Sequence, residues 1–163
     1  MQIAIVTDNP EQLAVLRALA LDAGLEQVKC FTHPAAALDW CAEHEPDLVL
    51  ADYMMRACDG LEFLRRFRAM PHLGSASIIL VLPSMLGLAG VRASAWQLGV
   101  TDFLGTPVDN TEFVARVRNL LLLRAATKSR PPAPSAGPLA NSVGSRWQET
   151  PPAAKPPNLA QFH

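Results

Sequence analysis

The chain has 163 residues, of which 50% are apolar and 18% are charged, and its formal net charge at pH 7 is −1. This length allows one domain of ordinary size and a tail. The near-neutral charge argues against a polybasic membrane anchor and against coating of nucleic acid. The cysteines Cys30, Cys41 and Cys58 form no Cys-x-x-Cys pair. This excludes a disulfide scaffold and a metal finger, and indicates reduced thiols in a cytoplasmic protein.

Short apolar runs alternate with amphipathic stretches along residues 1–126. A strand buried on both faces is apolar throughout, whereas a helix repeats its apolar residues every three or four positions. These patterns predict, in chain order, a strand at 3–6, a helix at 10–23, a strand at 27–31, a helix at 34–45, a strand at 48–50, a helix at 60–69, a strand at 78–82, a helix at 88–98, a strand at 101–104 and a helix from 110. Five strands alternating with five helices predict an α/β fold with a doubly wound five-stranded parallel sheet.

Two of the predicted helices begin with cap signals. Asn9 can cap the first helix, Pro10 suits its first position, and Gln12 can complete a capping box. Asp109 can cap the last helix. These side chains would satisfy the free N–H groups at the helix starts.

The stretch 69–91 carries no charge, with His72 taken as neutral, and it is apolar enough to suggest a membrane span. Pro83 interrupts it, and glycines lie near both of its ends. We therefore expect a strand, a turn and a helix start here, and no membrane association.

The composition changes near Thr127, because residues 128–163 hold eight of the 14 prolines and show no apolar periodicity. Such a segment cannot bury enough surface to offset the entropy lost on ordering. We expect one folded domain over 1–127 and a disordered tail rich in proline and alanine over 128–163.

Two acids follow predicted strands: Asp8 follows the first strand and Asp52 follows the third. If these strands are neighbours, as in the flavodoxin-like strand order, both carboxylates point into one crevice at the carboxyl edge of the sheet. Carboxylates with water and a carbonyl suit Mg²⁺, and a carboxylate beside such an ion can attack phosphorus. The alternative for either acid alone is a local role in ending its strand.

Three segments carry a family resemblance: "IAIVTDNP", "PDLVLADYMMRACDGLEFLRRFRAMP" and "GVTDFLGTPVDNTEFVARVRNLLLLR". They resemble the CheY-like receiver domain of bacterial two-component response regulators. The sequence of these segments is most similar to that of receivers fused to HD-GYP phosphodiesterase or diguanylate cyclase modules, neither of which this sequence contains. The resemblance implies the (βα)5 receiver fold and a non-enzymatic role in phosphorelay signalling.

The resemblance assigns roles to residues at the crevice. Asp52 matches the phosphoacceptor, and Asp8, Asp52 and the carbonyl of Met54 match the Mg²⁺ ligands. Phe103 matches the aromatic residue that switches between inward and outward rotamers. Counting along the chain places the switch hydroxyl at Ser84.

Aligning the fourth strand itself points instead to Leu82 or Pro83 as the switch position. Ser84 is the interpretation adopted, because counting from both Gly99 and Pro107 leads to it.

Three positions depart from the family pattern: Thr7 replaces an acid, Thr106 replaces a lysine and Arg56 replaces a proline. Thr7 brings no charge, although its hydroxyl can orient a metal-bound water, so Mg²⁺ should bind weakly. Thr106 cannot supply the ammonium that pairs with phosphoryl oxygens. Arg56 either substitutes for that cation or is a solvated surface residue.

Two hypotheses follow for the function. The first is a stand-alone atypical receiver that takes phosphate on Asp52 from a histidine kinase or phosphotransfer protein and acts through contact with a target protein. It includes a phosphate sink, in which Asp52 loses its phosphate to water. The second is a phosphorylation-independent pseudo-receiver that works as a protein-interaction module.

A third reading, a flavodoxin-like nucleotide-binding protein, lacks support, because no glycine-rich loop follows the first strand. Binding of nucleic acid is not expected either, because no basic recognition helix is present.

Leu122 and Leu123 lie outside the apolar stripe of the last helix. Together with Phe103 they predict a partner surface on the last helix and the fifth strand. This surface would serve a target protein or a homodimer.

Overall fold

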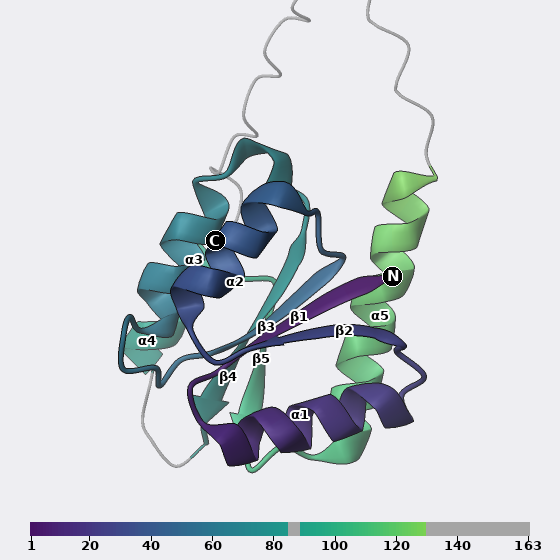
Figure 1. The fold of residues 1–163 in the computed structure, drawn as a ribbon, viewed down its shortest axis with the longest axis horizontal. Helices are drawn as coiled ribbons and strands as arrows, with labels where there is room; N and C mark the ends of the chain where they lie inside the picture. Colours follow the sequence, from purple (N-terminus) through teal and green to yellow (C-terminus); the bar gives the residue numbers. More distant parts are fainter. Residues whose placement is uncertain (85–88, 130–163) are drawn as a thin grey trace, which may run out of the picture. The chain divides into compact units, whose positions relative to one another are not determined.

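The structure is a computed structural model that describes residues 1–84 and 89–129. Its centre is a five-stranded parallel sheet in the order β2-β1-β3-β4-β5 (Figure 1). The strands are β1 (Gln2–Val6), β2 (Gln27–Phe31), β3 (Leu48–Asp52), β4 (Ser77–Pro83) and β5 (Asp102–Thr106). This order confirms the predicted doubly wound fold.

Helices cover both faces of the sheet, with α1 and α5 on one side and α2, α3 and α4 on the other (Figure 1). The helices are α1 (Pro10–Asp22), α2 (Pro34–Glu43), α3 (Gly60–Arg68), the 3₁₀ turn η1 (Pro71–Leu73), α4 (Ala89–Gln97) and α5 (Asn110–Lys128). The five α-helices agree with the predicted ones, while η1 was not predicted. Leu88, the expected first residue of the fourth helix, lies outside the described residues.

Each strand divides its side chains between two cores. In β1, Ala4 and Val6 enter the core under α2 and α3, whereas Ile3 and Ile5 enter the core under α1 and α5. All four side chains are fully buried. Burial on both faces explains why β1, β3 and β4 are apolar along most of their length, whereas the edge strand β2 is only partly buried and contains Lys29.

The predicted caps at Asn9 and Asp109 are confirmed, since each carboxyl or amide oxygen accepts from backbone N–H groups of the first turn. The predicted capping box is wrong. The Asn9 N–H donates to Thr7 Oγ1 at 3.2 Å, and Gln12 Nε2 is buried with no hydrogen-bond partner within residues 1–84 and 89–129. The first helix is therefore joined to the end of β1 through Thr7.

A charged cluster holds the carboxyl end of α5. Arg124 is 4% exposed, donates to the Ser75 carbonyl at 3.1 Å and pairs with Glu45. One turn later Lys128 donates to Asp47 at 2.6 Å. Buried charges need such partners, so this cluster ties α5 to the amino ends of β3 and β4.

Asp47 is the acid at the centre of this cluster. Burial works to raise its pKa, but hydrogen bonds from Lys128 and from the Gln2 N–H outweigh burial and hold the pKa below its usual value. The folded state therefore gains stability from this carboxylate above the unfolded pKa of about 3.9, and loses it as the pH falls through the lowered folded pKa.

The helix α5 runs through Lys128, one residue beyond the expected domain boundary at 127. The remainder of the expected tail, residues 130–163, lies outside the described residues. Within the described part of the chain, no helix has both the length and the apolar character needed to cross a membrane. The uncharged stretch 69–91 instead contributes β4 to the sheet.

Truncation after Ser129 should leave the melting temperature almost unchanged, whereas truncation after Thr127 should lower it by about 2–5 °C, because Asp47 loses the Lys128 ammonium. Thermal unfolding by circular dichroism measures both. Lys128→Met in the chain truncated after Ser129 is the matched control, and its penalty should shrink as the pH falls below about 4. A large loss of stability on truncation after Ser129 would contradict the expected disordered tail.

Candidate functional site

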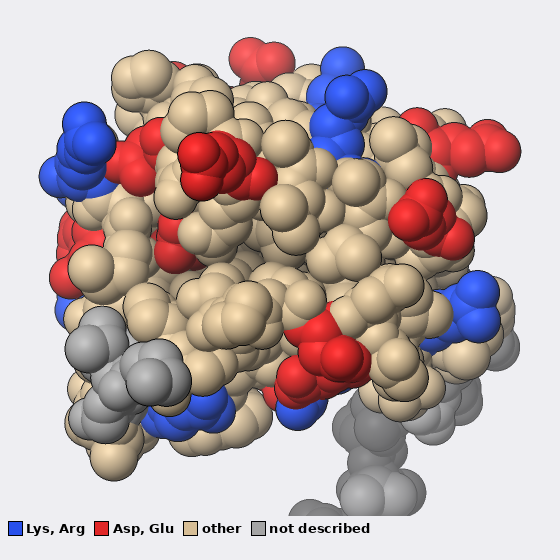
Figure 2. Space-filling view, turned by 90° about the horizontal axis from the view of Figure 1, so that it is seen from below, with Lys and Arg blue, Asp and Glu red and all other residues tan. Residues whose placement is uncertain are grey.

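The strands β1 and β3 are neighbours, with Val6 paired to Ala51, as the flavodoxin-like order requires. Thr7 and Asp8, which follow β1, and Asp52, which ends β3, therefore meet at the carboxyl edge of the sheet. Figure 2 views the molecule from below, the side on which α1 lies in Figure 1, and shows acidic and basic side chains distributed over this face.

The carboxylate of Asp52 is buried, with 3% of the residue exposed, and it accepts hydrogen bonds from other residues of the chain. Its Oδ2 accepts from the Thr7 hydroxyl at 2.7 Å, and its Oδ1 accepts from the Met54 N–H at 3.0 Å. Thr7 is fully buried and accepts from the Asn9 N–H at the same time. The expectation that Thr7 orients a metal-bound water differs from this arrangement, in which its hydroxyl donates to Asp52 directly.

Asp8 lies partly exposed at the rim of a hollow of about 550 Å³, which Met54 and Arg56 also line. Its Oδ2 accepts from the Arg56 N–H at 2.7 Å. The Arg56 residue is exposed, which agrees with the solvated interpretation of this side chain. The loops after β1 and β3 are thus joined by a main-chain donor.

Gly60 sets the distance between α3 and the end of β3. Its N–H donates to the Tyr53 carbonyl at 3.0 Å, and a Cβ atom at this position would lie 2.8 Å from Tyr53 Cα and 3.0 Å from the Asp52 carbonyl oxygen. Only glycine fits this approach without a shift of the backbone. Asp59 caps α3 by accepting from the Glu62 N–H at 2.8 Å, so the loop that follows Asp52 is held at both ends.

The ligand set that the family resemblance implies suits Mg²⁺. It consists of the carboxylates of Asp8 and Asp52 and the carbonyl of Met54, and Mg²⁺ is commonly bound by one or two carboxylates while it keeps several waters. Over residues 1–84 and 89–129, no group of three or more His, Cys, Asp or Glu side chains is placed to hold a metal ion. The oxygen donors of the expected ligand set fit a hard, largely hydrated ion such as Mg²⁺.

The strands β4 and β5 meet at the other side of the crevice. Pro83 pairs with Thr106, and the Ser84 N–H donates to the Thr106 carbonyl at 3.1 Å. A Cβ atom on Gly105 would overlap Ser84 Oγ, so the glycine leaves room for this hydroxyl. Leu82 is 1% exposed in the core and, like Pro83, has no hydroxyl, which favours Ser84 as the switch position.

Phe103, the expected switch residue, points inward and is 4% exposed. Its ring packs edge-to-face with Trp96 at 5.1 Å between centroids, and the Arg92 guanidinium lies 4.8 Å from its centroid. Phe103 is therefore not part of an exposed partner surface, contrary to the sequence-based expectation. The exposed apolar residues of this region are Trp96 (55%), Leu122 (69%) and Leu123 (63%).

The thiol nearest the site does not suit redox chemistry. Burial raises the pKa of Cys58, and burial raises that of Cys41 to about 11. Both thiols are therefore protonated at neutral pH, and the thiolate is the reactive form.

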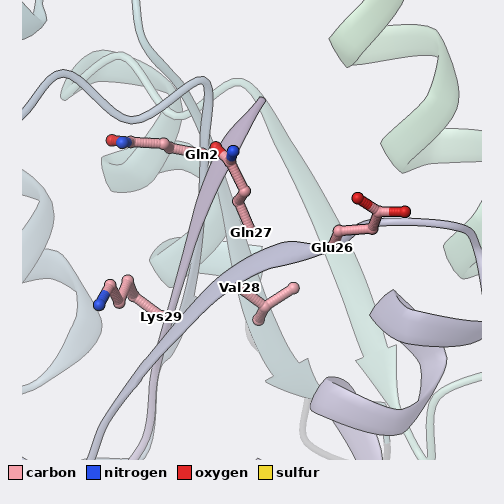
Figure 3. A pocket seen from close by; sticks show the side chains of 5 residues that line it. All are labelled: Gln2, Glu26, Gln27, Val28 and Lys29. Carbon is pink, nitrogen blue, oxygen red and sulfur yellow. The ribbon is translucent and has the colours of Figure 1, made fainter.

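A second hollow, of about 360 Å³, lies at the amino ends of β1 and β2, away from the candidate site. Figure 3 shows that its side chains diverge rather than converge on one point. Ligand sites need convergent polar groups, so this hollow adds nothing to the candidate site. It is lined by Gln2, Glu26, Gln27, Val28 and Lys29.

A comparison of the sequence with protein families agrees with the fold and with the position of the candidate site. The response regulator receiver domain matches residues 3–118. The chain belongs to this family. Receiver domains are modules of two-component signalling that interact with histidine kinases, and the match runs from Ile3 in β1 through the other four strands to Arg118, about halfway along α5.

Among curated proteins, the chain is similar to the cyclic di-GMP phosphodiesterase response regulator RpfG of Xanthomonas campestris, with 39% identity over 130 residues that cover 79% of this chain and 34% of RpfG. It is 31% identical to the response regulator Rre1 of Synechocystis over 127 residues, 78% of this chain and 54% of Rre1. The chain thus spans about a third to a half of the length of these relatives.

Solved structures share the fold. The receiver domain of an HD domain-containing protein of Pseudomonas fluorescens has a TM-score of 0.69 at 24% identity, covering 80% of this chain and 93% of that one. The receiver domain of a sensor histidine kinase of Pseudomonas aeruginosa has a TM-score of 0.65 at 24% identity, covering 74% and 96%. That structure has a magnesium ion coordinated in its active-site cleft.

Gly60→Ala should destabilise the domain by about 1–3 kcal/mol, because the added methyl meets backbone atoms at the end of β3. Gly90→Ala, in α4, is the matched control: no atom lies within 4 Å of its Cβ position, and alanine is the better helix former by about 1 kcal/mol. Urea unfolding measures both variants. Equal effects of the two substitutions would show that the close approach at Gly60 does not matter.

Proposed function

We propose that Asp52 takes a phosphoryl group from a phosphohistidine of a histidine kinase or phosphotransfer protein. In this step an Asp52 oxygen forms a bond to phosphorus, and the phosphorus–nitrogen bond breaks with the electron pair leaving on the imidazole. The observation that carries the proposal is the placement of the Asp52 carboxylate beside Asp8 at the carboxyl edge of β1 and β3.

Asp8, Asp52 and the Met54 carbonyl are the residues that would hold Mg²⁺ in this reaction. The bound ion supplies positive charge against the phosphoryl oxygens. Binding is expected to be weak, because Thr7 stands where the family has a third acid and contributes no charge. Thr106 supplies no ammonium, so transfer and the response to phosphate are both reduced.

We propose that the described residues act by contacting another protein through the face built by α4, β5 and α5. Trp96, Leu122 and Leu123 give this face exposed apolar area, and Arg116 pairs there with both oxygens of Asp102 at 2.7 Å. Exposed apolar side chains beside ordered charges are typical of protein interfaces. A target protein or a second copy of the chain is the proposed partner.

A phosphorylation-independent pseudo-receiver is the second candidate function. It is favoured by the hydrogen bonds that already satisfy the crevice, from Thr7 and Met54 to Asp52 and from Arg56 to Asp8. In this case the contact face operates without phosphate.

Wild-type protein incubated with acetyl phosphate and Mg²⁺ should gain the mass of one phosphoryl group, and Asp52→Asn should not. Intact-mass spectrometry measures the gain, and hydroxylamine should remove it, because an acyl phosphate is labile to this nucleophile. An unmodified wild-type chain at saturating Mg²⁺ would favour the pseudo-receiver.

Thr106→Lys should enlarge the response to beryllofluoride, because an ammonium near the acyl-phosphate position adds a charge-assisted contact of about 1.5–3 kcal/mol, roughly ten- to a hundredfold in a two-state equilibrium. The measurement is the shift of the Phe103 and α5 resonances in wild type and variant. Full-sized shifts in both proteins would mean that the lysine is not needed. Absence of shifts in both would again favour the pseudo-receiver.

Leu123→Glu should abolish self-association or partner capture through the α4-β5-α5 face without unfolding the domain, because a carboxylate would be buried in the contact. Val15→Glu, at a 51% exposed position on α1, is the matched control. Sedimentation velocity measures the association, and circular dichroism the fold. Unchanged assembly of Leu123→Glu would exclude this face.

A further inference from the structure

The loops that follow β1 and β3 are joined by one main-chain hydrogen bond at the candidate metal site. The Arg56 N–H donates to Asp8 Oδ2 at 2.7 Å, across 48 positions of sequence. This donor–acceptor distance lies at the short end for an N–H donor, as expected when the acceptor is charged. The bond therefore holds the more exposed of the two candidate carboxylate ligands.

This bond requires a residue other than proline at position 56. The family pattern has proline here, and proline has no backbone N–H. The Arg56 residue is exposed and lines the same hollow as Asp8, and its main-chain N–H contacts Asp8 directly. The departure from proline thus supplies a donor to the site that the family residue could not.

We propose that the Arg56 N–H is a positioning group, which holds Asp8 in the absence of metal and competes with Mg²⁺ for the Asp8 carboxylate. The inference rests on the proposed function, which assigns Asp8 as a metal ligand. To bind the ion through Oδ2, Asp8 must give up the hydrogen bond or share the oxygen with it. A carboxylate has about four acceptor positions, so the competition lowers the affinity without abolishing it.

The neighbouring carboxylate is arranged in the same way. Asp52 receives the Thr7 hydroxyl and the Met54 N–H, so donors from the chain reach both acids of the crevice. The Thr7 and Arg56 donors both come from positions that depart from the family pattern. Through these two positions, hydrogen bonds from the chain take the place of a metal ion at the two acids. The loops after β1 and β3 are therefore joined without the ion.

The test compares Mg²⁺ binding to wild type, Arg56→Pro and Arg56→Ala by calorimetric titration. Arg56→Pro removes the N–H and the guanidinium, whereas Arg56→Ala removes the guanidinium alone. Among residues 1–84 and 89–129 only glycines have positive φ, so a negative φ at position 56 leaves proline feasible. Arg56→Pro should bind Mg²⁺ about tenfold more tightly than Arg56→Ala, and Arg56→Ala should lie within about twofold of wild type, because an exposed charge is screened.

A second measurement uses the wild-type chain and does not depend on the folding of a variant. In EDTA the Arg56 amide proton should resonate downfield and exchange slowly with solvent, and Mg²⁺ should shift it upfield. Fast exchange of this amide in EDTA would overturn the inference.

The outcomes separate the inference from the proposed function. Equal Mg²⁺ affinities for the proline and alanine variants, with acetyl phosphate labelling of Asp52 intact, would overturn the inference alone. Absence of Mg²⁺ binding in all three proteins would overturn both the inference and the metal-dependent phosphorylation. Tighter binding confined to Arg56→Pro supports the inference.

Discussion

The structure depends on a buried carboxylate that must be kept in hydrogen bonds. Asp52 ends the central strand β3 at 3% exposure, and an ionised group at such a position is costly unless donors surround it. The Thr7 hydroxyl and the Met54 N–H provide them. Thr7 in turn accepts from the N–H of Asn9, the cap of α1. The candidate site is therefore continuous with the start of a helix, and its geometry is part of the fold.

The fold could be predicted because its signals are local. The bounds of β2 (Gln27–Phe31) agree with the predicted strand at both ends, since Gly24 ends the helix before it and Pro34 begins the helix after it. The burial of Arg124 could not be predicted, because its partners Glu45 and Ser75 lie far away in sequence. In α3, Phe63 is fully buried together with Leu64 and Phe67, whereas Leu61 is only partly buried.

The acidic side chains of the candidate site could be predicted from the sequence, whereas its main-chain hydrogen bonds could not. Strand order alone brings Asp8 and Asp52 to one edge, so their placement followed from the sequence. The donor to Asp8 is a backbone N–H of Arg56, and side-chain chemistry gives no signal for such a group. Phe103 was expected on a surface because apolar neighbours suggested one, but Arg92 and Trp96 of α4 cover its ring.

The central claim is that hydrogen bonds from the chain hold Asp52 when no metal ion is bound. A double-mutant cycle with Thr7→Val and Asp52→Ala, measured by urea unfolding in EDTA, tests it most directly. The account predicts a coupling free energy of about 1.5–3 kcal/mol between the two positions, as for a buried hydrogen bond to a charged group. Additive effects within about 0.5 kcal/mol would contradict it.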